Sequence, residues 1–417
     1  MKEKVLVIVI LIMTVISLSV MVAVGVLYFS QLSDKDGTVE TMVQTQGTGS
    51  NGQANSKNEN TKTQDSKADA KTMEDKSAVE NEEYNDEILK ITAVGDILLG
   101  RSVGLRVIKQ PSRYAYPFEK VADFLRRGDI VFGNLEESIT SSTKGLTGIK
   151  QGGKYVLKNE VEAIEGLKYA GFNLFSLANN HILDYYEKGL YDTIEILNKN
   201  GIAYAGAGRN LEEARKLTII EKKGIKVGLL AYTDMAEITY KGNPPLSFLA
   251  KDNKSGVAPT KIEYIREDMA KARGMVDLLI VSLHWGIEYT YEPTKKQVEI
   301  AHEIIDQGAD ILIGHHTHRF QSIEIYKEKP IFYSLGNFIF DQRDPENQQG
   351  FLMEMEYKDK KLARLSGIPF KIRDVSQIVP QSGKDAAEII YREIKLCEKM
   401  DTPSHMENDK IIFDIKN

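Results

Sequence analysis

The sequence predicts a layered α/β domain that follows a transmembrane helix and a disordered polar linker. Three observations lead to this prediction. An almost unbroken apolar run opens the 417-residue chain, a polar stretch follows it, and short apolar runs then alternate with amphipathic helical patterns. Such alternation is typical of domains in which helices pack on a β-sheet.

The first element is the apolar run from Val5 to Phe29, which follows Lys2 and Lys4. As a helix it would be roughly 37 Å long, enough to cross the hydrocarbon core of a bilayer. A cleaved signal peptide has a shorter apolar region, so we expect residues 1–29 to be a cytoplasmic stub and an uncleaved signal anchor. Positive charge on the N-terminal side predicts a single-pass cell-membrane protein whose C-terminal domain is extracellular.

The second element, residues 30–87, consists mainly of Thr, Gln, Asn, Ser, Gly, Lys, Asp and Glu. Burial of so few apolar groups cannot offset the entropy lost when a chain becomes ordered. We therefore expect a disordered polar linker with a root-mean-square reach of roughly 40 Å, which would hold a folded domain clear of the lipid.

The third element is a folded domain over residues 88–375, which a helical extension over residues 376–417 follows. The strand-like runs are 88–96, 129–136, 172–180, 226–233, 277–285, 309–316 and 329–340. The helical patterns are 161–171, 191–201, 264–274, 296–309 and, in the extension, 384–400. The net charge of −6, without a basic stripe interleaved with aromatic residues, argues against nucleic-acid binding. Cys397 is the single cysteine, which excludes an intrachain disulfide.

Groups that can bind a metal or transfer a proton stand at the ends of several strand-like runs. The carboxyl ends of strands are where open α/β sheets bind ligands, so we expect these groups to converge on one cleft. Carboxylate, amide and neutral imidazole groups are ligands for divalent cations, here Mn, Zn or Mg. The candidate metal ligands are Asp96, Glu136, Asn180, His284, His316 and His318.

The segment GHHTH, residues 314–318, carries the strongest of these signals. Two histidines separated by one residue on a tight turn can point both rings into one site, whereas ordinary loop histidines bond to the backbone and stay exposed. For His284, which follows a buried apolar run, the alternative to metal binding is a structural role. We expect no function for His302, on a helical pattern, or for His405, near the C-terminus.

The candidates for proton transfer are His181 and Asp184, in the segment SLANNHILD. An imidazole beside a metal ligand can act as a general acid toward a leaving oxygen. The alternative is an Asn-rich turn in which Asp184 caps the next helix.

Substrate contacts are expected from residues near the same strand ends. Arg101 could clamp an anion, and Glu288 could line a substrate groove. Asn337 and Asp341 could hydrogen-bond a substrate, with a turn role as the alternative.

Several motifs together resemble one family. The segments GDILLGR, DIVFGNLE, SLANNHILDYYEKGL, YAGAGRN, LHWGIEY, IGHHTHRFQ and YSLGNFIFDQ occur in the order seen in the CapA family of bacterial capsule-synthesis proteins. The resemblance covers about residues 90–345. It implies a calcineurin-like metallophosphatase type of fold, a membrane anchor, and work with membrane partners in making or exporting poly-γ-glutamate.

The resemblance also implies roles for individual residues. Asp96 and His318 would bind a first metal, Asn180, His284 and His316 a second, and His181 would donate a proton. Leu98 stands where the phosphatase pattern has His, and Asn134, counted here with the substrate-binding residues, stands where it has a bridging Asp. Either Glu136 replaces that bridge or a single metal binds.

Three functions follow from these observations. The first is a membrane-anchored, extracellular component of poly-γ-glutamate capsule biosynthesis or export, with a metal cleft that handles an anionic polymer. The second is a surface metal-dependent hydrolase, a phosphoesterase or an amidase, acting on a cell-wall polymer. The third is a non-catalytic assembly subunit.

Overall fold

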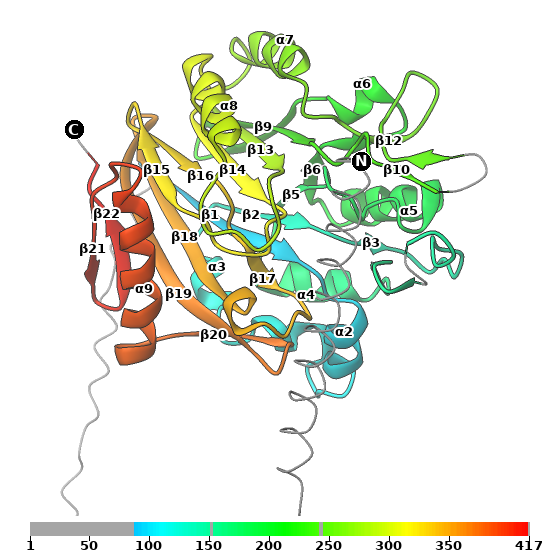
Figure 1. Ribbon diagram of the computed structural model, residues 1–417, viewed down its shortest axis with the longest axis horizontal. Coiled ribbons are helices and arrows are strands. Elements are labelled where there is room, and N and C mark those ends of the chain that lie inside the picture. Colours follow the sequence, from blue (N-terminus) through cyan, green and yellow to red (C-terminus); the bar gives the residue numbers. More distant parts are fainter. Residues whose placement is uncertain (1–86, 151–152, 242–244, 416–417) are drawn as a thin grey trace, which may run out of the picture. The chain divides into compact units, whose positions relative to one another are not determined.

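Two mixed β-sheets with helices on their outer faces form the described part of the chain (Figure 1). The computed structural model describes residues 87–150, 153–241 and 245–415. The predicted anchor, 1–29, and the predicted linker up to residue 86 lie outside the described residues. Within the described ranges, no helix has both the length and the apolar character needed to cross a membrane. The predicted α/β fold is confirmed.

The larger sheet has the strand order β21-β22-β19-β18-β1-β2-β5-β6, with β17 beside β1 and β20 beside β19. Its strands are β1 (Ile88–Ile97), β2 (Ile130–Leu135), β5 (Leu174–Ser176), β6 (Ala203–Ala205), β17 (Asn337–Ile339), β18 (Gln349–Lys358), β19 (Lys361–Arg373), β20 (Gln377–Pro380), β21 (Ser404–Glu407) and β22 (Lys410–Phe413). Strands β17, β1, β2, β5 and β6 are parallel, so their carboxyl ends lie at one edge.

The smaller sheet has the order β15-β16-β14-β13-β9-β8. Its strands are β8 (Thr218–Lys222), β9 (Ile225–Thr233), β13 (Leu278–His284), β14 (Ile311–His315), β15 (Ile323–Tyr326) and β16 (Lys329–Phe332). Strands β9, β13, β14 and β16 are parallel. Short two-stranded pairs are β3 (Ser138–Ile139) with β4 (Lys158–Asn159), β7 (Ala207–Gly208) with β12 (Gly256–Val257), and β10 (Thr239–Tyr240) with β11 (Leu246–Ser247).

Helices connect these strands. They are α2 (Arg101–Val107), α3 (Ala122–Leu125), α4 (Ala163–Ala170), α5 (Tyr186–Lys199), α6 (Leu211–Ala214), α7 (Ile262–Ala272), α8 (Lys295–Asp306) and α9 (Gly383–Glu398), with 3-10 helices η1 (Arg113–Phe118) and η3 (Pro345–Asn347). Residues at the helix termini determine where several of these helices begin or end. Thr294 and Gln297 form a capping box at the start of α8, and Gly171 ends α4 in the left-handed conformation.

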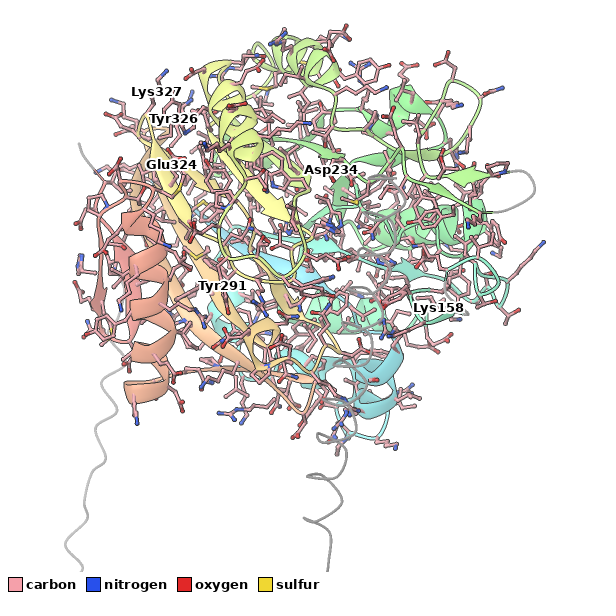
Figure 2. All side chains as sticks on the ribbon, in the orientation of Figure 1. Lys158, Asp234, Tyr291, Glu324, Tyr326 and Lys327 are labelled. Carbon is pink, nitrogen blue, oxygen red and sulfur yellow. The ribbon has the colours of Figure 1, made fainter. Side chains whose placement is uncertain are left out.

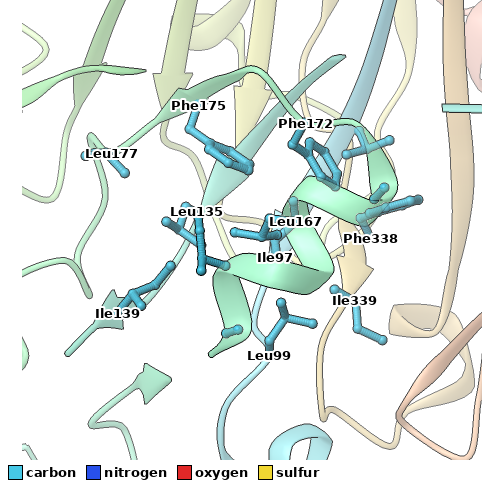
Figure 3. Packing of buried hydrophobic residues seen from close by; sticks show 14 of the residues in the cluster. Ile97, Leu99, Leu135, Ile139, Leu167, Phe172, Phe175, Leu177, Phe338 and Ile339 are labelled. Carbon is cyan, nitrogen blue, oxygen red and sulfur yellow. The ribbon is translucent and has the colours of Figure 1, made fainter. Parts of the chain in front are cut away.

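The two sheets pack face to face, because successive residues of their central strands enter different cores. In β1, Ala93 belongs to the core between the sheets and Val94 to the core beneath α4 and α5. In β9, Leu229 lies between the sheets and Leu230 lies with residues of α7 and α8. Figure 3 shows the outer core of the larger sheet, where Leu167 of α4 covers buried side chains of β1, β2 and β17. This packing holds the carboxyl ends of β1 and β2 rigidly.

Two segments differ in detail from the predicted elements. The strand-like run 329–340 forms two strands in different sheets, β16 and β17, because the chain turns between them at Gly336, whose φ is +60°. Period-two hydrophobicity does not specify which sheet a strand joins. Beyond residue 376 the structure has α9 and also β20, β21 and β22, which join the larger sheet.

Candidate functional site

The predicted polar residues at the strand ends lie together in one buried group. Asp96 is in β1, Glu136 follows β2, and His181 follows β5, all in the larger sheet. The remaining members come from the ends of β13 and β14 in the smaller sheet. The group, called here the carboxylate–histidine cluster, consists of Asp96, Glu136, His181, His284, His315, His316 and His318, all buried. The site therefore lies where the strand ends of two sheets meet, rather than at the edge of one open sheet.

Short distances define the centre of the cluster. Asp96, Glu136 and His318 each offer one ligand atom, and these atoms lie within 4.8 Å of one another. Glu136 Oε1 lies 3.8 Å from His284 Nε2 and 3.9 Å from His181 Nε2. The ring centroids of His284 and His316 are 4.8 Å apart. The cluster is thus continuous from one sheet to the other.

Close backbone approach at two glycines makes this convergence possible. A Cβ on Gly95 would lie 1.9 Å from the carbonyl oxygen of Gly336, and one on Gly314 would lie 1.9 Å from that of Tyr333. Only glycine fits at either position. The turn that follows is strained, since His316 and His318 have φ of +92° and +59°. Strain of this kind in non-glycine residues is concentrated at functional sites.

Burial sets the charge of the histidines. It lowers the pKa of His181 to about 4, with a further contribution from the Lys150 charge, and lowers the pKa of His316 to about 3, helped by His318. Burial, with the neighbouring His316, also lowers the pKa of His284 well below its usual range. These imidazoles are therefore neutral near pH 7, which is the form that binds metals.

The two carboxylates of the cluster respond differently. Burial alone would raise the pKa of Asp96, but His315, whose Nδ1 lies 3.2 Å from Asp96 Oδ1, and His318 lower it below the ordinary value. Burial raises the pKa of Glu136 well above its usual range, and the Asp96 charge raises it further. The cluster therefore holds one carboxylate, Asp96, whose ionised form its neighbours stabilise, and one, Glu136, whose ionised form burial and Asp96 disfavour more than the Lys150 charge favours it.

Glu136 and Glu137 are adjacent, equally buried carboxylates with opposite surroundings. Glu137 accepts hydrogen bonds from the backbone nitrogens of Leu99 and Gly100 at 2.8 and 3.0 Å, and from Asn159. Among the described residues, neither oxygen of Glu136 has a hydrogen-bond partner. An ionised carboxylate buried in this way is costly unless a cation compensates it. The residues present thus fit a divalent cation on the Glu136 side of the cluster.

His181 is held by a buried ion pair. Its Nδ1 lies 2.8 Å from Asp184 Oδ2, and Lys150 Nζ donates to Asp184 Oδ1 at 2.5 Å and to the Asn180 carbonyl at 2.7 Å. Helix α5 begins at Tyr186 without a side-chain cap, so the alternative of Asp184 as an N-cap is wrong. Asp184 instead orients the imidazole.

The remaining predicted residues have varied surroundings. Asn180 Oδ1 lies 2.9 Å from His284 Nε2, and Asn337 Oδ1 lies 2.9 Å from His318 Nδ1, so both amides orient cluster histidines. Asn134 is fully buried and donates to Asp96 Oδ1 at 2.8 Å, inside the cluster.

The other predicted substrate contacts lie nearer the surface. Arg101 Nε lies 3.2 Å from Asp341 Oδ2, so a carboxylate of the chain itself already pairs with the predicted anion clamp. Glu288 is exposed beside Tyr289, whose ring stacks on His318 with centroids 6.0 Å apart.

Sequence reasoning missed Lys150 and Asn179. Asn179 accepts from the backbone nitrogens of His181 and Ile182 and donates to Asn134 Oδ1, so it fixes the turn. The doubled Asn in SLANNH was a usable signal for it, whereas Lys150 lies in a loop without a pattern. Leu98 packs with Leu157 and Phe340, which makes an apolar wall where the phosphatase pattern has a ligand.

Fold and site together define a mixed α/β protein with a buried carboxylate–histidine cluster at the ends of its parallel strands. Residues 90–342 match the family model described as bacterial capsule synthesis protein PGA_cap. The chain belongs to this family, which confirms the resemblance drawn from its motifs.

Individual relatives agree with this assignment. The chain is 33% identical over 315 residues to capsule biosynthesis protein CapA of Bacillus anthracis, covering 74% of this chain and 73% of that protein. It is 32% identical to PGA biosynthesis protein CapA of Bacillus subtilis (strain 168), covering 80% and 84%. A putative 5'-nucleotidase from Staphylococcus aureus gives a TM-score of 0.41 at 13% identity, over 75% of this chain and 58% of that one, too distant to indicate an activity.

Proposed function

We propose that the chain is a membrane-anchored, extracellular component of poly-γ-glutamate capsule biosynthesis or export, and that its carboxylate–histidine cluster binds a divalent metal. Membership of the capsule-synthesis family supports the first part. The apolar run of residues 5–29 supports the anchor. The observation that carries the metal is the buried Glu136 carboxylate, which has no hydrogen-bond partner among the described residues.

Asp96, Glu136 and His318 would hold the metal, because their ligand atoms are the mutually close set. His284 and His316, which are buried and neutral, lie beside them as further potential ligands. Glu136 would take the place of the bridging aspartate that Asn134 replaces. A bound divalent cation would supply Lewis-acid polarisation of a phosphoryl or carbonyl oxygen.

A metal-dependent hydrolase acting on a phosphoester or amide bond is the second candidate. The His181 imidazole favours it, because Asp184 fixes the orientation of the ring. An ionised Asp184 only accepts hydrogen bonds, so the proton of a neutral His181 lies on Nδ1 and leaves Nε2 to accept one. Lys150 keeps Asp184 in place. This arrangement suits an acid–base residue that first takes a proton and then returns it.

A non-catalytic assembly subunit is the third candidate, and Leu98 favours it. Its apolar contacts with Leu157 and Phe340 form an apolar wall at the position where the phosphatase pattern has a histidine ligand. A site with a single structural metal would be enough for assembly.

Metal analysis of the purified full-length chain tests the proposal. We expect the wild type to retain Mn or Zn and His318→Ala to lose it, while His405→Ala, a change of an exposed histidine outside the cluster, keeps it. Metal retained equally by all three proteins would exclude the cluster as the binding site.

Complementation of a deletion strain separates the candidates. Loss of polymer with His318→Ala supports the metal-dependent capsule role. The hydrolase is supported if the purified chain hydrolyses a bond of a wall polymer and His181→Ala does not. Normal polymer with His318→Ala, together with no polymer after deletion of residues 5–29, supports the assembly subunit. Unchanged polymer in the deletion strain itself would overturn the capsule role.

A further inference from the structure

A basic groove lies along α2. It has a volume of about 470 Å³, and its lining includes Ser102 and Arg106 of α2, Lys109 just after it, Arg343 after β17, and Asp374. The groove therefore presents three cationic side chains and a single carboxylate. Helix α2 contacts η1, which also contacts β20, so the groove has a packed floor.

The three cations of this basic groove are free to bind an anion. Arg106, Lys109 and Arg343 are exposed and, in the part of the chain that the structure describes, their side chains form no ion pair or hydrogen bond. Arg101, at the start of the same helix, is paired with Asp341 at 3.2 Å. The cations without an ion pair at this face therefore lie in the groove, whereas Arg101 already has a carboxylate partner.

Contacts link the basic groove to the cluster. The backbone nitrogen of Ser102, which lines the groove, donates to Asp341 Oδ2 at 3.3 Å. Asp341 follows Phe340, whose ring packs against that of His318 with centroids 4.8 Å apart. The basic groove is therefore connected to the candidate metal site through Asp341 and Phe340.

We propose that the basic groove binds a segment of a carboxylate-bearing polymer and guides it to the carboxylate–histidine cluster. Arg106 and Lys109 are three residues apart and can meet successive charges along one ligand. Leu105, which also lines the groove and is 64% exposed, offers apolar contact for the methylene groups between those charges. Three separated cations suit a repeating polyanion better than one small anion. The identity of the polymer as poly-γ-glutamate rests on the proposed function.

Binding of purified poly-γ-glutamate to the full-length chain tests this proposal. We expect Arg106→Gln/Lys109→Gln/Arg343→Gln to weaken binding about tenfold or more, because three exposed charges that attract the polymer are removed together. The salt dependence of binding should become shallower as well. The matched control is Lys251→Gln/Lys361→Gln/Lys384→Gln, which removes the same charge from other exposed positions. Thermal unfolding checks that both variants fold.

The outcomes separate this proposal from the proposed function. Equal weakening in the groove and control variants would mean that net charge alone matters, and would overturn the groove. Tighter binding of polyphosphate than of poly-γ-glutamate would overturn a carboxylate polymer as the ligand. Binding that falls in the groove variant but persists in His318→Ala supports a groove independent of the metal. That result would stand even if polymer output in cells proved unaffected by deletion of the gene.

Discussion

Two clusters among the described residues, one around Glu136 and one around Glu324, pair histidine with a buried carboxylate, and they differ in whether the carboxylate oxygens have hydrogen-bond partners. In the second cluster, Glu324 Oε1 lies 2.8 Å from His302 Nε2, and Glu324 Oε2 accepts from the Tyr333 hydroxyl at 2.6 Å. The His302 ring also stacks on Tyr326 with centroids 3.9 Å apart; Glu324 and Tyr326 are labelled in Figure 2. In the carboxylate–histidine cluster, by contrast, both Glu136 oxygens lack a hydrogen-bond partner among the described residues.

The difference teaches that residue types alone do not identify a ligand site, and that the hydrogen bonding of the buried carboxylate is what distinguishes these two clusters. A carboxylate whose oxygens are all hydrogen-bonded can remain where it is without a ligand. One that is buried and unpartnered needs a proton or a cation. The satisfied cluster is therefore structural, and the unsatisfied one is the candidate metal site. Substitutions in either cluster test this contrast.

Lys150→Met should strongly reduce stability. Lys150 and Asp184 form an ion pair whose side chains are 4% and 0% exposed, and removal of the cation leaves a buried carboxylate uncompensated. Breaking a buried pair in this way costs about 3–5 kcal/mol. Urea unfolding of the full-length chain measures the loss. Lys188→Met, which breaks an exposed pair with Asp192, is the control and should cost about 1 kcal/mol or less. Similar losses in the two variants would contradict the structural role of Lys150.

Metal should stabilise the protein through Glu136 and not through Glu324. At a free metal concentration 100-fold above Kd, the free energy of unfolding should rise by about 2.7 kcal/mol. Glu136→Gln should abolish this rise, and a chelator should reverse it in the wild type. The matched change Glu324→Gln, in the satisfied cluster, should keep it. Calorimetry with and without Mn or Zn gives the answer, and an unaltered rise in Glu136→Gln would remove Glu136 from the site.

Members of the carboxylate–histidine cluster stand out in the sequence because they are polar residues at or soon after the ends of buried runs. Asp96, His284 and His318 lie, as predicted, at or just beyond strand ends. The alternation of apolar runs and helical patterns likewise predicts the α/β fold. Neither pattern determines that the strands divide into two facing sheets, since the same hydrophobic run is compatible with either sheet.

Other features of the site depend on three-dimensional contacts that no local pattern carries. Lys150 reaches Asp184 from a loop, and its neighbours in sequence give no sign of this. His316 and His318 have positive φ, a backbone conformation that the residue pattern of GHHTH does not predict. The absence of partners around Glu136 is a property of the whole arrangement.

Glu393 of α9 shows a third way in which a buried carboxyl group is accommodated. The group stays protonated. Burial raises its pKa to about 8, although the Cys397 thiol, which donates to its Oε1 at 3.3 Å, opposes the shift. Its stabilising contribution is complete below the ordinary value of 4.5 and is lost as the pH rises toward 8.

Unfolding measured from pH 4 to pH 9 tests this assignment. Relative to Glu393→Gln, the wild type should lose up to about 1.4 kcal/mol of stability for each pH unit between these values, because only the unfolded state releases the proton there. Stability curves that run parallel at every pH would show that Glu393 is ionised in the folded chain.

His302→Ala should have the smallest effect, which makes it the strictest test of the contrast. The His302 side chain is 31% exposed, so its pair with Glu324 contributes about 1 kcal/mol or less. The variant should keep the full metal-induced rise in melting temperature, whereas His318→Ala should lose it, although both remove an imidazole next to a carboxylate. Scanning calorimetry of the two variants with and without metal makes the comparison directly. If both lost the rise, unsatisfied atoms would not be what separates the two clusters, and Glu324 would have to be considered as a ligand.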